Sequence, residues 1–327
     1  MRPFSYWRAE NEAGAIARLT AYPGAAYIAG GTTLLDLMKD DVLHPDLLVD
    51  ITHLPLWGIE VTEDAIVIGA LTTMSEAADN ALLRERYPLI TQALLASASQ
   101  QLRNMATLGG NLLQRTRCSY FRDPVFACNK RMPGSGCAAL VGENRVHAIF
   151  GTSENCIATH GSDLAVALIA LDAALEVHGP NGSRRIPLAH FYLLPGTTPE
   201  REHVLKPGEL IAALEIPTTF NASRSTYLKV RDRASYEFAL VSAAVALELD
   251  GSTVRAARIA LGGVGTIPWR VRAAEALLQN APLARETCAA AAEAALTGAI
   301  PQRDNAFKIE LTRRTLIRAL TTVGGIA

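Results

Sequence analysis

The residues in this chain that are most suited to chemistry are four clustered cysteines. Cys118, Cys128, Cys137 and Cys156 are separated by nine, eight and eighteen residues rich in Gly, Pro and Asn. Four thiolates in irregular chain can hold a zinc ion or an iron–sulfur cluster. Neither the two-residue spacing of zinc knuckles nor ferredoxin-type spacing is present. From spacing alone, a [4Fe–4S] cluster, a zinc site and a mixture of disulfides with free thiols are all open.

Two glycine pairs form the second set of chemical candidates. Residues 29–33 read AGGTT after a short apolar run, and residues 107–111 read TLGGN. Backbone N–H groups in a glycine turn can converge on a pyrophosphate, and threonine hydroxyls can add further donors. Neither turn matches the GxGxxG pattern of Rossmann folds, and glycine pairs also occur in plain turns.

Composition restricts the possible functions. The chain has 327 residues, enough for two or three domains, and its 49% hydrophobic and 19% charged residues are typical of a globular protein. A net charge of −1 gives no electrostatic basis for binding nucleic acid or anionic membrane. No apolar run approaches membrane-spanning length, and the N-terminal segment lacks an export signal. Five cysteines, an odd number, favour metal ligation or free thiols over a disulfide framework.

Hydrophobic periodicity predicts an N-terminal part of mixed strands and helices, then a polar linker at 218–225. The predicted strands of this part are 26–29, 47–51, 65–70, 174–178 and 209–217, and its predicted helices are 13–20, 34–39, 88–99 and 163–174. Three consecutive strands and then three helices follow the linker. They are predicted at 226–233, 238–249, 254–264, 271–278, 285–296 and 307–323. Consecutive strands followed by helices indicate an α+β domain.

Several segments occur in the order found in one known family. They are AGGTTLLDLMK (29–39), TLGGNL (107–112), GSDLAVALIALDA (161–173), YLKVRDRASYEFALVSAA (227–244) and GGVGTIPWR (262–270). Over nearly its whole length the chain resembles the FAD-binding subunits of the xanthine dehydrogenase, or molybdenum hydroxylase, family. Within that family it is most similar to the FAD subunits of bacterial periplasmic aldehyde oxidoreductases.

The resemblance implies an α+β architecture in two domains. Residues 1–220 are expected to form a vanillyl-alcohol-oxidase-like (PCMH-type) FAD-binding domain with subdomains at about 1–55 and 56–220. Residues 225–327 are expected to form a CO-dehydrogenase-flavoprotein-like C-terminal domain, with a three-stranded antiparallel sheet plus helices.

The chain departs from the common family pattern between Asn111 and Asp163. Most members join these positions by about ten residues, whereas here an insert at about 112–162 contains the four clustered cysteines. The aldehyde oxidoreductase FAD subunits and 4-hydroxybenzoyl-CoA reductase have such an insert with a [4Fe–4S] cluster. The resemblance therefore implies that these cysteines are cluster ligands, and we expect the cluster to tie down the insert. Cys288 is expected to be an ordinary buried thiol, and His147 and His160 to be surface or satisfied residues.

The resemblance also implies which residues contact FAD. They are Tyr27, Ile28, Ala29, Gly30, Gly31, Thr32, Thr33, Leu34, Thr107, Gly109, Gly110, Asn111, Asp163, Leu205 and Lys229. Asp163 is expected to accept hydrogen bonds from the ribose or nearby backbone, and the alternative is an N-cap role. Lys229 is the expected cation near the flavin, with Arg231 and Arg233 as alternatives. Leu205 packs either on one of the cofactor rings or in the core.

The implied function is electron transfer within a heterotrimer. A large subunit would hold the molybdenum cofactor and convert an aldehyde and water to a carboxylic acid, and a small subunit would hold two [2Fe–2S] clusters. This chain would receive the electrons on FAD and pass them to an external acceptor, after export to the periplasm bound to a signal-bearing partner. Two other classes stay open, a stand-alone flavoenzyme of the same fold and a non-catalytic zinc scaffold.

Overall fold

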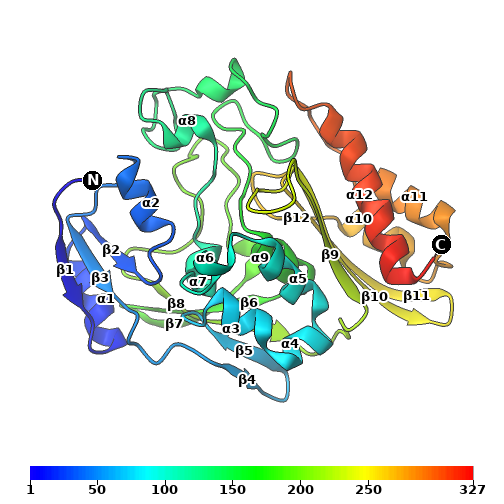
Figure 1. Ribbon diagram of the computed structural model, residues 1–327, viewed down its shortest axis with the longest axis horizontal. Coiled ribbons are helices and arrows are strands. Elements are labelled where there is room, and N and C mark those ends of the chain that lie inside the picture. The colour runs from blue at the N-terminus through cyan, green and yellow to red at the C-terminus, as the bar shows by residue number, and fades with distance from the viewer. Residues whose placement is uncertain (327) are drawn as a thin grey trace.

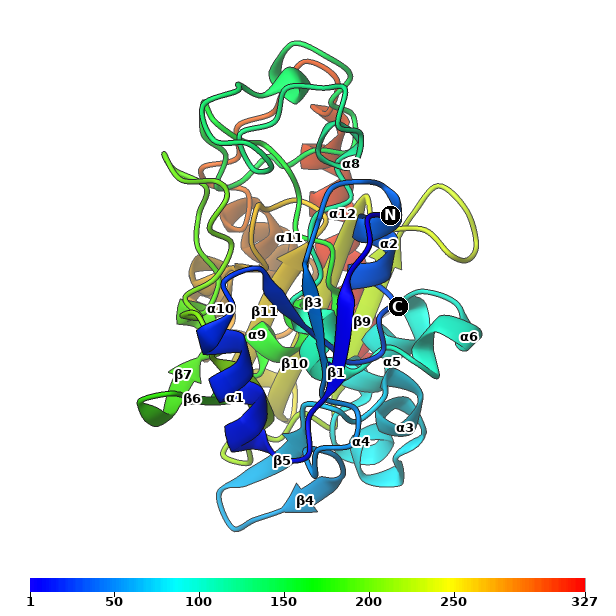
Figure 2. The same ribbon diagram turned by 90° about the vertical axis from the view of Figure 1, so that its left-hand side faces the viewer.

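The computed structural model describes residues 1–326, and its N-terminal strands form a small parallel sheet (Figures 1 and 2). The strand order is β1-β3-β2, from β1 (Ser5–Arg8), β2 (Ala25–Ile28) and β3 (Leu47–Asp50). Helices α1 (Glu12–Ala21) and α2 (Leu34–Lys39) connect successive strands. The expected strands and helices of this region are present, but β1 was not predicted. This four-residue strand is mostly exposed and shows no apolar alternation.

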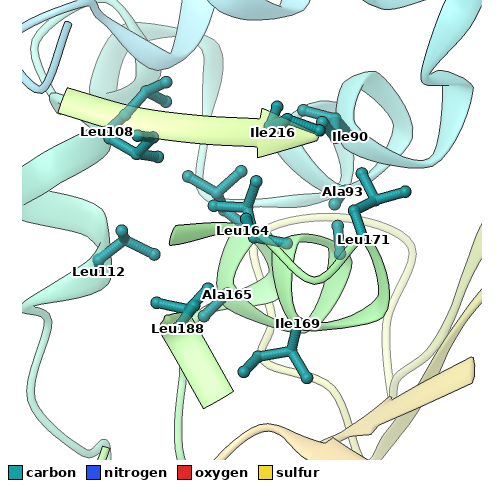
Figure 3. Packing of buried hydrophobic residues seen from close by; sticks show 14 of the residues in the cluster. Ile90, Ala93, Leu108, Leu112, Leu164, Ala165, Ile169, Leu171, Leu188 and Ile216 are labelled. Atoms are coloured by element: carbon teal, nitrogen blue, oxygen red, sulfur yellow. The ribbon is translucent and has the colours of Figure 1, made fainter. Parts of the chain in front are cut away.

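A second sheet is antiparallel and has the order β4-β5-β8-β6-β7. Its strands are β4 (Ile59–Val61), β5 (Ala65–Gly69), β6 (Ala174–Gly179), β7 (Gly182–Pro187) and β8 (Leu210–Pro217). The accompanying helices are α3 (Met74–Asp79), α4 (Ala81–Arg86), α5 (Pro88–Ala96), α6 (Gln100–Arg103), α7 (Leu108–Leu112), α9 (Asp163–Ala170) and the 3-10 turn η2 (Leu188–His190). Every residue of α9 is buried, and Figure 3 shows Leu164 of this helix packed among apolar side chains from neighbouring elements.

The third sheet contains four strands within the described residues, where the sequence predicted three. Its order is β12-β11-β10-β9, from β9 (Ser225–Val230), β10 (Val241–Asp250), β11 (Thr253–Gly262) and β12 (Trp269–Arg270). The unpredicted strand β12 has only two residues, which pair with Leu261 and Ala260. A strand this short carries no periodicity, so the sequence pattern does not reveal it.

The third sheet separates two cores because successive side chains of β10 point to opposite faces. Val241, Val245 and Leu247 pack towards helices α10 (Arg272–Leu278), α11 (Arg285–Ala294) and α12 (Phe307–Gly324). Ala244 and Ala246 instead join the core that contains α5 and α9. The sheet therefore belongs to both halves of the chain. No helix in residues 1–326 is long and apolar enough to cross a membrane.

The insert between α7 and α9 is mostly irregular, with α8 (Ser119–Arg122) and the 3-10 turn η1 (Ala138–Leu140) as its helical pieces (Figure 1). Its later part is fixed to the segment that follows β11, since the Ile149 and Phe150 amides donate to Val264 O at 2.8 and 3.0 Å. Its earlier part is fixed to α2, where Asp36 accepts from Arg117 and Arg122 at 2.8 and 2.6 Å. Protein contacts therefore hold the insert in addition to any cluster.

Candidate functional site

The first glycine turn connects β2 to α2 and lies directly against another stretch of backbone. A Cβ atom on Gly30 would stand 1.8 Å from Met105 O, so no larger residue fits there without moving one of the two chains. The next residue, Gly31, has φ of +70°, a conformation that favours glycine. Both glycines are therefore required by the backbone path of the turn.

This turn presents backbone donors that the protein leaves unused. Within residues 1–326, the amides of residues 30–34 donate to no protein acceptor, and the Thr33 side chain makes no capping bond to α2. Residues 29–34 line a cavity of about 230 Å³, together with Tyr27. Half-buried amides that precede and begin a helix, with no protein acceptor and beside a cavity, fit an anionic group such as a pyrophosphate.

The second glycine turn forms the opposite wall of this cavity through Thr107, Gly109 and Gly110. It is the short helix α7 and not an open loop, and its amides are already used. Gly109 N–H donates to Ala70 O at 2.8 Å, and Gly110 N–H donates to Thr107 Oγ1 at 3.2 Å. The expectation of a second set of free amides is therefore wrong. Gly109 instead permits close packing, since its Cβ would lie 2.9 Å from the Ala70 side chain.

A second cavity, of about 320 Å³, continues from the first and shares Thr32, Thr33 and Gly110 with it. Its far wall holds Asp163 and Lys229, whose side chains are joined by a 2.8 Å ion pair. Asn111 also lines this cavity. Lys229 Nζ also donates to Ala96 O at 3.1 Å. The two residues expected to contact the cofactor separately thus form one buried unit.

The Asp163 carboxylate is fully engaged by protein donors. Besides Lys229, it accepts from Ser97 Oγ at 2.8 Å and from Tyr227 Oη at 2.6 Å. Burial, assisted by the negative charge of Asp163, raises the pKa of Tyr227 well above its usual range, so the phenol stays protonated and donates. The alternative N-cap role for Asp163 is wrong, because Ser162 caps α9 by accepting from the Ala165 amide.

Arg231 and Arg233, the alternatives to Lys229 as the cation near the flavin, lie in different places. Arg231 also donates to Ala96 O at 3.0 Å, beside Lys229. Arg233 lines the second cavity together with Tyr236 and Phe238. Arg233 and these two aromatic side chains therefore give the second cavity a basic and aromatic part of its wall.

A third cavity, of about 370 Å³, adjoins the first through Leu113 and Arg115. Leu205 lines this cavity, away from both glycine turns. Glu202 binds Arg115 and lies 3.0 Å from Lys130 Nζ. Burial opposes ionisation of Glu202, but these two cations outweigh it and hold its pKa below the usual range.

Histidines add aromatic surface to the third cavity. The His160 ring stands edge-on to Tyr192 with centroids 4.4 Å apart, and His203 also lines the wall. Burial lowers the pKa of His160 to about 4, so the ring is neutral near pH 7. Ile28 lines none of these cavities and instead packs 3.5 Å from the Cβ position of Gly31.

Some residues of the site were not predicted from the sequence. Tyr227 stands two residues before Lys229 on β9, so alternation along the strand could have placed both on one face. Ser97, Met105 and Arg115 carry no comparable signal, because their positions depend on contacts between distant segments.

The structure brings the four insert cysteines into one buried cluster with Leu37 and Phe121. Cys118, Cys128 and Cys156 are buried and Cys137 is half-buried, and Cys128 and Cys137 pair across an antiparallel bridge. Burial raises the pKa of Cys118 to about 12, so without metal this thiol is protonated and metal binding must displace its proton. Four thiols in one apolar pocket provide the donor set of an iron–sulfur cluster.

The cysteines do not form a ready-made chelate for a single ion. In the part of the chain that the structure describes, no three Cys, His, Asp or Glu side chains gather closely enough to hold one metal ion. A tetrahedral zinc site needs sulfur atoms about 3.8 Å apart, from a Zn–S bond of about 2.3 Å. A four-iron cluster holds its thiolates further apart. Cys288 lies elsewhere, fully buried on α11 in the C-terminal core.

Comparison with known families matches almost the whole chain. Residues 2–219 match the family described as FAD binding domain in molybdopterin dehydrogenase, and residues 226–323 match the CO dehydrogenase flavoprotein C-terminal domain. The chain is 49% identical to the aldehyde oxidoreductase FAD-binding subunit of Escherichia coli over 98% of each chain. It is 28% identical to the glyceraldehyde dehydrogenase medium chain of Sulfolobus acidocaldarius, over 83% of this chain and 79% of the relative.

The whole chain also resembles chains of solved structures of carbon monoxide dehydrogenases. The chain resembles a chain of the Cu,Mo-CO dehydrogenase with a TM-score of 0.79 and 25% identity, covering the whole of both chains. It resembles a chain of the carbon monoxide dehydrogenase of Hydrogenophaga pseudoflava with a TM-score of 0.77 and 26% identity, over 100% and 99% of the two chains.

Proposed function

The chain belongs to the FAD-binding subunits of the molybdenum hydroxylase family, and from this premise we propose that it transfers electrons in a molybdenum-dependent aldehyde oxidoreductase. The observation that carries the proposal is the run of unpaired amides at residues 30–34 beside a continuous cavity. The chain is 49% identical, over 98% of its length, to a subunit of an aldehyde oxidoreductase, and this similarity supports an aldehyde as the substrate of the complex. The chemistry at the aldehyde takes place in another subunit.

We propose that FAD lies along the three adjoining cavities. The amides of residues 30–34 bind and orient its pyrophosphate, with Thr107, Gly109 and Gly110 as the facing wall. One end of the cofactor occupies the second cavity beside Lys229, and the other end lies near Leu205 in the third. Bound FAD supplies a store of two electrons. Lys229 remains fixed by Asp163 and Ala96 O, so its charge adjoins the cofactor without closing the cavity.

We further propose that the insert holds a [4Fe–4S] cluster. Its ligands are Cys118, Cys128, Cys137 and Cys156. The gathering of all four side chains in one cluster, three of them buried, supports this ligand set. A cluster of this kind supplies a one-electron carrier.

The proposal includes partners and a location. A large subunit with the molybdenum cofactor and a small subunit with two [2Fe–2S] clusters complete the complex, and an external acceptor takes the electrons. The name medium chain, carried by a relative in another organism, is consistent with such a three-part assembly. We propose that the assembled complex reaches the periplasm through a partner's signal. Fractionation of cells in which that signal is deleted tests this, and a periplasmic chain in those cells contradicts it.

The principal test is the cofactor content of the complex purified with its partners. We expect one flavin, eight iron atoms and eight sulfides per copy of this chain, four of each from the small subunit's two [2Fe–2S] clusters, and bleaching of the flavin absorbance when an aldehyde is added. A flavin-containing complex with only the four iron atoms of the small subunit would refute the cluster in this chain and keep its FAD role. The absence of both flavin and this chain's iron would refute the proposed function.

A further inference from the structure

A fully buried lysine lies beside the cysteine insert. Lys308, near the start of α12, has no exposed surface. Its Nζ donates to three backbone carbonyls, Val146 O at 3.0 Å, His147 O at 2.9 Å and Gly263 O at 2.7 Å. These contacts use all three donors of the ammonium group.

Lys308 has no counter-charge in the described protein. No carboxylate in residues 1–326 forms an ion pair with it, and the charged side chain acting on it is another cation, Arg145. Buried ammonium groups are otherwise paired with an anion or neutralised. Burial lowers the pKa of Lys308 to about 7, which is the response expected of a cation whose anion is missing.

His147 connects this lysine to the cysteines. Its carbonyl accepts from Lys308, and its ring Nε2 lies 3.2 Å from Cys118 Sγ. The ring is buried and Nδ1 has no hydrogen-bond partner in the described chain. The neutral tautomer that satisfies this geometry carries the proton on Nε2, where a Cys118 thiolate would accept it.

We propose that Lys308 and His147 are positioning residues that supply the positive side of the iron–sulfur site. Lys308 provides the buried charge that balances the anionic cluster, and His147 Nε2–H donates to the Cys118 thiolate. This inference rests on the proposed [4Fe–4S] cluster. The anion that Lys308 lacks and the thiolate that accepts from His147 Nε2 then belong to one group, the cluster with its ligands.

The arrangement has a consequence for the cluster's reduction potential. A cluster with four thiolates carries a net negative charge, and one-electron reduction adds another. A buried cation and a hydrogen bond to sulfur both favour the more negative state, so both raise the potential. Removing either contribution shifts the equilibrium towards the oxidised cluster.

The test is an EPR-monitored redox titration of the intact complex with dithionite as the one-electron reductant. Lys308→Met removes the charge at similar length, and His147→Asn removes the donor at the Nε2 position. We expect each to shift the reduction equilibrium at least tenfold, equivalent to about 59 mV for one electron. His147→Gln places an amide donor near the lost Nε2 and is expected to restore most of the shift. Arg314→Gln is the control, because Arg314 lies on the same helix as Lys308, is exposed and is already paired with Glu310.

Iron and sulfide are counted in the same samples. Loss of iron from Lys308→Met with flavin retained also supports the pairing, because an anionic cluster without its counter-charge binds more weakly. If both variants keep their full iron and their reduction equilibrium constants lie within twofold of wild type, the inference is overturned, whereas the cluster assignment stands. A His147→Gln variant no different from His147→Asn overturns the donor role. A wild-type complex with only the four iron atoms of the small subunit overturns the proposed cluster, and this inference with it.

Discussion

Replacing Gly30 by alanine should remove flavin from an otherwise folded chain. The added Cβ would lie 1.8 Å from Met105 O and 2.6 Å from Met105 C. Carbon atoms of this kind do not approach such atoms within 3.0 Å, so the turn or its neighbour must move by at least 1.2 Å, the difference between these two distances. Both partners are backbone, so no side-chain rotation can relieve the overlap.

The displacement affects stability and cofactor binding by different amounts. Overpacking of this size typically costs about 1–3 kcal/mol of folding free energy. An amide–phosphate hydrogen bond of about 2.9 Å stretched by more than 1 Å is lost. Each bond to a charged group contributes about 1.5–3 kcal/mol, so losing two weakens FAD binding by about a hundredfold or more.

The assay is the flavin-to-protein ratio after dialysis, with the thermal unfolding midpoint measured in parallel. Gly251→Ala serves as the matched control, since Gly251 has φ of +58° and no atom within 4 Å of its Cβ position. It should cost about 1 kcal/mol and retain flavin. A folded Gly30→Ala chain with full flavin would refute the placement of the cofactor at this turn.

The remaining predictions concern the buried polar groups and the cysteines. Replacing any one insert cysteine by serine should remove most of the iron and sulfide that this chain carries, whereas Cys288→Ser should leave both unchanged in chemical assays. Asp163→Asn leaves Lys229 buried without a counter-charge and should cost about 3–5 kcal/mol in urea unfolding, and adding Lys229→Met should recover part of that loss. In iron-free protein, stability should rise by up to about 4 kcal/mol from pH 7 to pH 10, because only the unfolded chain keeps Lys308 protonated there.

Each of these predictions has a clear contrary result. Iron lost from Cys288→Ser but kept by an insert variant reassigns the ligands. A double variant no more stable than Asp163→Asn shows that the two side chains are not coupled. Equal stability at pH 7 and pH 10 shows that Lys308 is charged in the folded chain, and the cluster-loaded chain should show a smaller rise than the iron-free one.

Long elements with clear periodicity were predicted well from the sequence. β10, β11 and α12 lie close to their expected positions because each presents a sustained apolar face to a core. Among the missed elements, β4 and β12 have three and two residues, too few to show a period, and β1 and β7 are mostly exposed and show no apolar alternation. They exist because neighbouring strands offer free hydrogen-bonding edges, which is a property of the assembled sheet.

The candidate site was predicted in its parts but not in its connections. The glycines of the first turn follow an apolar strand, and that local pattern was sufficient to place them. The contact of Gly30 with Met105 and the pair formed by Asp163 and Lys229 depend on segments that are 66 or more residues apart. Local pattern carries no information about such contacts. The second turn was misjudged because its threonine cap, which begins a helix, was less conspicuous than its glycines.

The alanine face of the third sheet limits how the chain can be divided into fragments that fold separately. Ala244, Ala246 and Ala260 form a wall of the same core as α5 and α9, although the two halves match separate families. A fragment that ends at residue 220 would lose this wall and expose an apolar surface, so we expect it to aggregate. A chimera that takes its C-terminal half from a relative must keep small side chains at these positions, because a larger residue would push the third sheet away from the helices that carry Asp163 and Ala96.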